Sequence, residues 1–116
     1  IDAVWVGWDE LAAPVARAIE QAGIEDPPFV VSMDGIDETV ALIRAGGPVA
    51  LTVAYNVRRM GELAVQVTAN ALAGEMPATK ALTLQPCLIT QDTAPAEGEA
   101  IDFDGCILFS GEALVE

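Results

Sequence analysis

Three short apolar runs, each followed by a segment with helical spacing, constrain the fold of this sequence more than any other feature. The runs cover residues 3–7, 29–33 and 49–54. Each is almost entirely apolar, which is typical of strands in a parallel sheet that is covered on both faces. Because such strands alternate with helices, we expect an α/β fold: a three-layer parallel sheet with flanking helices.

The segments between and after these runs carry helix signals. Residues 10–22 have apolar side chains at helical spacing. A second helix is expected to begin at Asp34 or Asp37, and a third, over residues 57–73, to begin after Asn56, a good N-cap residue. The inward face of this third helix is expected to carry Met60, Leu63, Ala64, Val67 and Ala71.

The last third of the chain contains weaker signals. Residues 82–90 predict a fourth strand, which Pro86 restricts to a sheet edge or a bend. Residues 101–103 and 106–109, joined by Asp104-Gly105, are compatible with a short hairpin through a type I′ turn. The positions of these strands leave residues 91–98 as a loop.

Two cysteines, Cys87 and Cys106, show no metal-binding spacing. In an oxidising compartment they could pair, whereas in the cytosol they would be two small apolar core residues. The sequence leaves both possibilities open.

The charge balance excludes several classes of function. The chain has a net charge of −13, five basic residues and no histidine. A phosphate-binding surface needs clustered Lys and Arg, and only Arg58-Arg59 comes close, so we expect no nucleic-acid partner for this segment. Hydrophobic residues make up 53% of the chain, which indicates a folded protein, but its apolar runs are too short to span a bilayer.

Enzymatic chemistry finds little support in the sequence. Adjacent Asp9 and Glu10 would point apart on a helix and cannot act as an acid–base pair across a substrate. With no histidine, the commonest general base and metal ligand is missing. Residues 46–48 (Gly-Gly-Pro) precede a strand and do not form a phosphate loop. We therefore expect no enzyme activity, cofactor or metal site.

Polar and aromatic side chains gather where the three apolar runs end. They are Trp8, Asp9, Asp34, Tyr55 and Asn56, with Glu10 and Arg58 beside them. In open α/β sheets, ligands bind outside the carboxyl ends of the strands. Carboxylates and amides bond vicinal hydroxyls, and an aromatic ring covers the C–H face of a sugar. This rim therefore suits a neutral polyhydroxylated ligand.

The same residues also have structural interpretations. Asp9 and Asp34 could each cap a helix, and Trp8 could be a half-buried lid on the core. Gly35 indicates a close backbone approach. Arg58 is expected to be solvated or paired with the acidic surface.

Several motifs in order resemble one family. They are WDELA at 8–12, MDG at 33–35, TVAYN at 52–56 leading to Met60-Gly61, AGE at 73–75 and LIT at 88–90. Together they look like the C-terminal part of periplasmic sugar-binding proteins, the ribose-binding-like type I solute receptors of ABC importers. Each motif alone is weak, but their order and spacing are fairly specific, and the resemblance covers roughly residues 2–95.

The resemblance implies a two-lobed clamp in the periplasm that closes on a small sugar or polyol and presents it to a membrane permease. By the family pattern, Asp34 bonds sugar hydroxyls, Tyr55 makes a polar contact near the hinge, and Asp9 matches a widespread motif aspartate. Trp8 stands where the family commonly has asparagine, so we expect it to stack on the sugar and not to bond a hydroxyl.

Receptors of this kind are more than twice as long, so the resemblance also implies a fragment or a truncated gene product. Residues 1–95 would form a partial C-terminal ligand-binding lobe, and residues 96–116 a C-terminal extension. The helix over residues 57–73 would pack on the missing N-terminal lobe. Without that lobe, we expect the uncovered apolar surface to be buried by self-association.

Two other classes share the expected fold. One is the effector-binding domain of a transcriptional repressor, and the other is an oligomerisation module that has lost its ligand. The sequence does not name the sugar, because pocket specificity in a clamp depends on both lobes.

Overall fold

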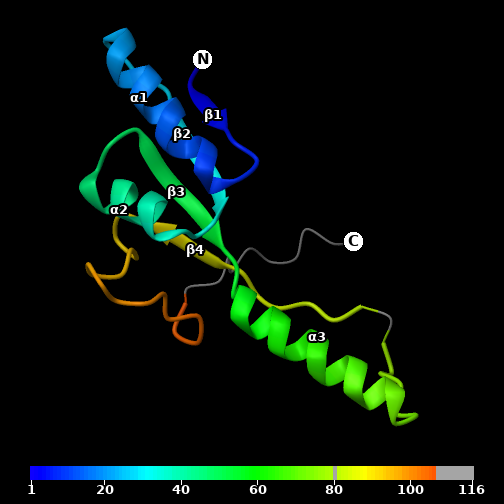
Figure 1. The fold of residues 1–116 in the computed structure, drawn as a ribbon. Helices are drawn as coiled ribbons and strands as arrows, with labels where there is room; N and C mark the ends of the chain where they lie inside the picture. The colour runs from blue at the N-terminus through cyan, green and yellow to red at the C-terminus, as the bar shows by residue number, and fades with distance from the viewer. Residues whose placement is uncertain (80, 107–116) are drawn as a thin grey trace, which may run out of the picture.

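The fold is built on a four-stranded sheet, seen in a computed structural model that describes residues 1–79 and 81–106 (Figure 1). The strands lie side by side in the order β1-β2-β3-β4. Their bounds are β1 Ala3–Trp5, β2 Phe29–Asp34, β3 Val49–Ala54 and β4 Cys87–Thr90. The first three are parallel and the fourth is antiparallel, so the sheet is mixed.

Two helices cover one face of this sheet. After the short 3₁₀ helix η1 (Asp9–Leu11), α1 spans Ala12–Ala22 and α2 spans Asp37–Ala45. Both belong to β-α-β units whose strands are sequential neighbours, so the constant hand of such crossovers puts both helices on the same side. Between the helices and the sheet lies the core, which includes Ala16, Ile19, Val30, Val40, Ile43, Val49, Ala54 and Ile89.

The opposite face of the sheet is apolar and uncovered. Register places Trp5, Val31 and Leu51 in one row across the strands. Met33, Val53 and Leu88 form the next row. No side chain in either row is buried, and Trp5 is 66% exposed. The predicted α/β sheet with flanking helices is confirmed, but the described residues supply two of its three layers.

The antiparallel direction of β4 corrects the expectation of an all-parallel sheet. Helix α3 (Val57–Leu72) runs away from the carboxyl end of β3 and does not cross back over the sheet (Figure 1). The chain therefore re-enters the sheet at the carboxyl end of β3 and runs antiparallel to it. In this pairing Cys87 lies opposite Ala54, and Thr90 lies opposite Leu51. The predicted edge position is confirmed: Pro86 immediately precedes the strand.

Helix α3 lies outside the core. The prediction that one of its faces points inward is wrong for this chain, because none of its residues is buried and Met60 is 51% exposed. The reason is the direction of the helix, which leads away from the sheet, and none of the other helices in residues 1–79 and 81–106 lies beside it (Figure 1). No helix among the described residues is long and apolar enough to cross a membrane.

The predicted hairpin near the C-terminus is also wrong in its first half. Residues 101–103 form no strand, and residues 107–109 lie outside the described part of the chain. The Asp102 carboxylate instead accepts hydrogen bonds from the backbone N–H groups of Asp104 (3.1 Å) and Gly105 (3.0 Å). Such a local side-chain turn competes with strand pairing.

The open question about the cysteines is resolved by the structure. Cys87 in β4 and Cys106 form a disulfide, with 5.7 Å between their Cα atoms. This bond ties the segment after β4 to the helix-covered side of the sheet, where Cys87 is buried.

Candidate functional site

Asp9 occupies the centre of the sheet's carboxyl edge and is fully buried. Its Oδ2 accepts hydrogen bonds from the backbone N–H groups of Gly35 and Ile36, both at 2.8 Å. Its Oδ1 accepts a third bond, also 2.8 Å long, from the Thr52 hydroxyl in β3. One carboxylate thereby joins the turn after β1, the turn after β2 and the middle of β3.

These bonds give Asp9 the first of the two roles predicted for it, helix capping and ligand contact, which do not exclude each other. The carboxylate caps a helix, but the helix is α2 and not the one that Asp9 itself begins. The backbone carbonyl of Asp9 also accepts a 3.3 Å bond from the Thr39 hydroxyl in α2. Both carboxylate oxygens are bonded and Asp9 is fully buried, so in this conformation its side chain faces the framework, while its contact with a ligand stays a prediction.

Gly35 lies against β3 more closely than a larger residue could. It has a φ of 82°, and a Cβ at this position would lie 2.9 Å from the Cα of Ala54 and closer still to its Cβ. The predicted close backbone approach is thus confirmed, and the approached segment is the end of the neighbouring strand.

Asp34 precedes this tight turn and has a left-handed φ of 122°, which is uncommon for a residue other than glycine. Its side chain does not cap α2. That helix begins at Asp37, and the Asp9 carboxylate accepts the N–H of the preceding residue, Ile36. The Asp34 side chain is instead partly exposed at the carboxyl end of β2. Backbone strain at such a position is typical of functional sites.

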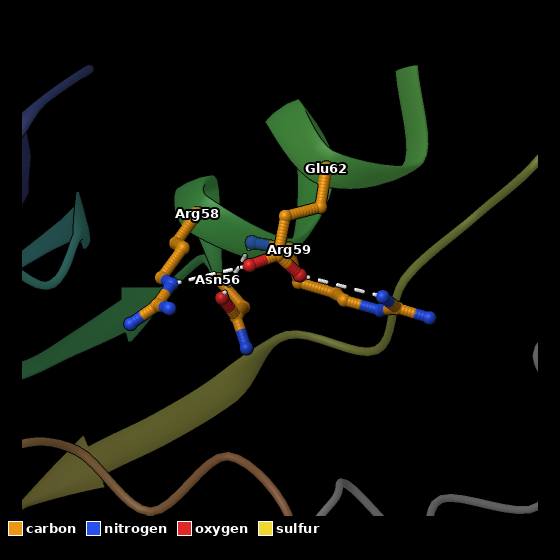
Figure 2. A network of polar contacts seen from close by, with 4 residues as sticks. All are labelled: Asn56, Arg58, Arg59 and Glu62. Atoms are coloured by element: carbon orange, nitrogen blue, oxygen red, sulfur yellow. Dashed lines mark hydrogen bonds and ion pairs between the residues drawn. The ribbon is translucent and has the colours of Figure 1, made fainter. Parts of the chain in front are cut away.

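Tyr55 and Asn56 follow β3 at the same edge. The Tyr55 N–H donates a 3.2 Å hydrogen bond to the Asp34 carbonyl, so the ends of β2 and β3 are joined beside the two side chains. Asn56 Oδ1 accepts a 2.9 Å bond from the Arg59 N–H, which confirms the predicted N-cap of α3 (Figure 2). In the described part of the chain, the amide nitrogen of Asn56 has no such partner.

The arginines beside Asn56 form ion pairs. Arg58 was predicted to be either solvated or paired with an acidic residue, and the second alternative is found. Arg58 and Arg59 both reach Glu62, at 3.2 and 3.4 Å (Figure 2). Hydrogen bonds from the Arg58 and Arg59 side chains lower the pKa of the Glu62 carboxyl. These side chains are largely solvated, so the pairs contribute little to stability.

Trp8 stands at the end of the first strand's extension, directly before Asp9. The residue is 52% exposed, so about half of its surface is buried and half is open to a ligand, as either interpretation of Trp8 requires. An exposed aromatic ring next to a polar rim is available to cover an apolar ligand face.

A groove of about 580 Å³ begins at Tyr55 and Asn56 and runs between α3 and residues 82–85. Its apolar lining comes mainly from Met60, Leu63, Val67, Leu82 and Leu84. The apolar stripe that the sequence placed toward the core therefore lines this groove. The groove continues from one end of the polar rim.

Sequence reasoning missed the partners of Asp9. Thr52 and Thr39 are both fully buried, and Thr52 is a polar residue within an otherwise apolar strand. A threonine on the buried side of a strand requires a hydrogen-bond partner, and this signal could have indicated a buried acceptor nearby. The described residues contain no cluster of three or more residues suited to hold a metal ion.

Comparison with known proteins identifies the class of this fold and rim. Residues 1–76 match the model of the periplasmic binding protein domain. The chain belongs to this family, as the motifs of its sequence predicted. Among curated protein sequences, no relative matches.

Solved structures with the same fold include three components of ABC transporters. An ABC transporter solute-binding protein from Agrobacterium vitis with bound allitol is 25% identical, with a TM-score of 0.74 over 81% of this chain and 32% of that one. An ABC sugar transporter subunit from Rhodobacter sphaeroides 2.4.1 is 28% identical, with a TM-score of 0.70 over 79% and 32%.

The third is the periplasmic component of the arabinose ABC transporter from Shewanella sp. ANA-3, bound to arabinofuranose. It is 29% identical, with a TM-score of 0.69 over 81% of this chain and 31% of that one. This chain thus spans about a third of the length of these proteins.

Proposed function

We propose that this chain is part of the solute-binding component of an ABC-type sugar importer and that its rim binds a small sugar or polyol. The observation that carries the proposal is the junction of β2 and β3. There, Asp34 and Tyr55 are joined by a backbone hydrogen bond, and both side chains are partly exposed. Asp34 would accept bonds from vicinal hydroxyls, and Tyr55 would add a hydroxyl of its own.

Asn56 and Trp8 complete the proposed contacts. The Asn56 oxygen is engaged in the cap of α3, which leaves its amide nitrogen to donate to a ligand hydroxyl. The exposed Trp8 ring would cover the C–H face of the ligand. In this account Asp9 is a positioning residue, since it holds Gly35 and so fixes where Asp34 points.

The chemistry of the rim favours a neutral ligand. The Asp34 and Glu10 carboxylates lie on or beside it, and Arg58 and Arg59 share the single Glu62 carboxylate, so the acidic and basic groups nearly balance. The net charge of −13 repels anions. Two structural relatives hold bound allitol and arabinofuranose, which are neutral polyhydroxylated compounds.

We also propose an exported location and two macromolecular contacts. A disulfide between Cys87 and Cys106 is typical of an oxidising compartment such as the periplasm. The exposed sheet face and the groove along α3 would pack on a second lobe, since the structural relatives are about three times as long. The membrane permease of the importer would receive the closed, loaded clamp. This binding role involves no enzymatic step.

A thermal-shift screen of pentoses, hexoses and polyols against the full-length protein tests the proposal. A compound that binds only the folded state raises the unfolding midpoint, and the rise grows with ligand concentration. We expect at least one neutral sugar or polyol to do so. If every compound leaves the midpoint unchanged, the solute-binding role fails and the ligand-free oligomerisation module becomes the better account.

A further inference from the structure

The segment after β4 lies against the helix-covered core without forming a helix or strand. We refer to residues 94–106 as the latch segment. Four of its side chains, Ala94, Ile101, Phe103 and Cys106, pack on the hydrophobic core. The disulfide to Cys87 fixes its far end at the edge strand.

The latch segment reaches the turn that carries Asp34. The Cδ1 atom of Ile101 lies 3.2 Å from the place that a Cβ would take at Gly35. The same Cβ position lies against Ala54, and the Gly35 N–H donates to Asp9. The turn is therefore held between β3, the Asp9 carboxylate and the Ile101 side chain.

Few other bonds hold the latch segment in place. In the described part of the chain, two bonds hold its start: the Ala94 N–H donates to the Thr90 carbonyl at 2.8 Å, and the Arg44 guanidinium donates to the Pro95 carbonyl at 2.9 Å. Further along, the bonds from Glu99 to Ala96 and from Asp104 and Gly105 to Asp102 stay within the segment. A segment with so few bonds to its surroundings would open readily without a covalent tether.

We propose that Ile101 is a positioning residue for the ligand rim and that the Cys87–Cys106 disulfide keeps it there. The disulfide holds the latch segment on the core, Ile101 then closes one side of the Gly35 turn, and the turn fixes Asp34. The contribution to ligand binding rests on the proposed function. The effect on the turn does not depend on any ligand.

Amide hydrogen exchange in the full chain tests the effect on the turn directly. The reporters are the N–H groups of Gly35 and Ile36, which donate to Asp9, and the reference is the Val30 N–H, bonded to Pro48 at 2.8 Å. In Ile101→Ala and in Cys106→Ala, we expect exchange at the two reporters to rise at least about tenfold relative to Val30.

Leu42→Ala is the matched control, because Leu42 also packs partly buried on the core but belongs to α2. A global loss of stability should change the reporters and the reference together, so their ratio stays constant in this variant. If the ratio is equally constant in Ile101→Ala and Cys106→Ala, or rises as much in Leu42→Ala, the inference is overturned.

Binding measured on the same variants separates this inference from the proposed function. With allitol or L-arabinose as the probe, the inference expects weaker binding in Ile101→Ala and unchanged binding in Leu42→Ala. If the exchange ratio rises but neither probe nor any compound of the screen binds the unaltered protein, the proposed function fails and the role of Ile101 at the turn stands. If a probe binds Ile101→Ala as tightly as the unaltered protein, the role of Ile101 in binding is overturned.

Discussion

The Thr52 hydroxyl in β3 donates a 2.8 Å hydrogen bond to the carboxylate of Asp9, which follows β1 on the far side of β2. The same carboxylate accepts the N–H groups of Gly35 and Ile36 in the turn after β2. One buried side chain thus joins the turns after β1 and β2 to the middle of β3. This arrangement allows the strained Asp34 backbone to persist, because its surroundings fix it from several directions.

Removing the Asp9 carboxylate should destabilise the protein strongly. Asp9→Ala leaves three donors in or near the core without an acceptor, and we expect the free energy of unfolding to fall by about 3 kcal/mol or more. Glu10→Gln alters the neighbouring exposed carboxylate and should change it by less than about 0.5 kcal/mol. Urea denaturation of both variants compares the two effects. Similar losses of unfolding free energy would contradict the role of Asp9 in joining the turns after β1 and β2 to β3.

Two glycine-to-alanine substitutions should change the free energy of unfolding in opposite directions. Gly35→Ala forces a Cβ into Ala54 at a left-handed φ, so we expect a loss of about 2 kcal/mol or more. Gly61 lies inside α3 with open space around it, and Gly61→Ala should raise stability by about 0.5–1 kcal/mol through helix propensity. Thermal unfolding of the pair measures both shifts. A gain in Gly35→Ala would show that the turn is looser than described.

The disulfide should contribute to global stability as well as to the position of Ile101. It joins residues 19 positions apart, and closing a loop of that size stabilises by about 3 kcal/mol in the chain-entropy account. Denaturation of the oxidised protein with and without a thiol reductant measures this. The Cys106→Ala variant should match the reduced protein and should not respond to the reductant. Equal denaturation midpoints for the oxidised and the reduced protein would show that the disulfide does not stabilise the fold.

Asn56 allows the helix cap to be separated from ligand binding. Asn56→Asp keeps an oxygen for the Arg59 N–H, so stability should stay within about 0.5 kcal/mol, but the amide donor is lost and sugar affinity should fall. Asn56→Ala should lose both affinity and about 1 kcal/mol of stability. Calorimetric titration together with thermal unfolding resolves the two effects. Unchanged affinity in Asn56→Asp would remove Asn56 from the site.

Local patterns in the sequence were sufficient for the elements that pack within this chain. The apolar runs marked β2 and β3, and Gly23 and Gly46 end α1 and α2 in the left-handed conformation that glycine favours. Asn56 marked the start of α3 for another local reason: its side-chain oxygen accepts a hydrogen bond from the Arg59 N–H, three residues further on.

Features set by distant contacts were not visible in the sequence. The direction of β4 depends on the path of α3, and the apolar stripe on α3 looks identical whether it faces a core or a groove. Asp9 has a capping role that sequence spacing could not assign to α2, since its partners lie 26 and 27 residues away. The position of Ile101 beside Gly35 is likewise a contact between residues far apart in the sequence, which no local pattern indicates.

The central claim, that Asp34 on this rim binds a neutral sugar or polyol, is tested most directly by calorimetric titration of Asp34→Gly in the full-length protein. Glycine adopts a φ of 122° without strain, so this variant should unfold at the same temperature or higher. Glu38→Gln, an exposed acidic residue in the first turn of α2, is the control and should bind as the unaltered protein does. We predict that Asp34→Gly shows no measurable heat of binding with the sugar that the unaltered protein binds, and full affinity in this folded variant would contradict the account.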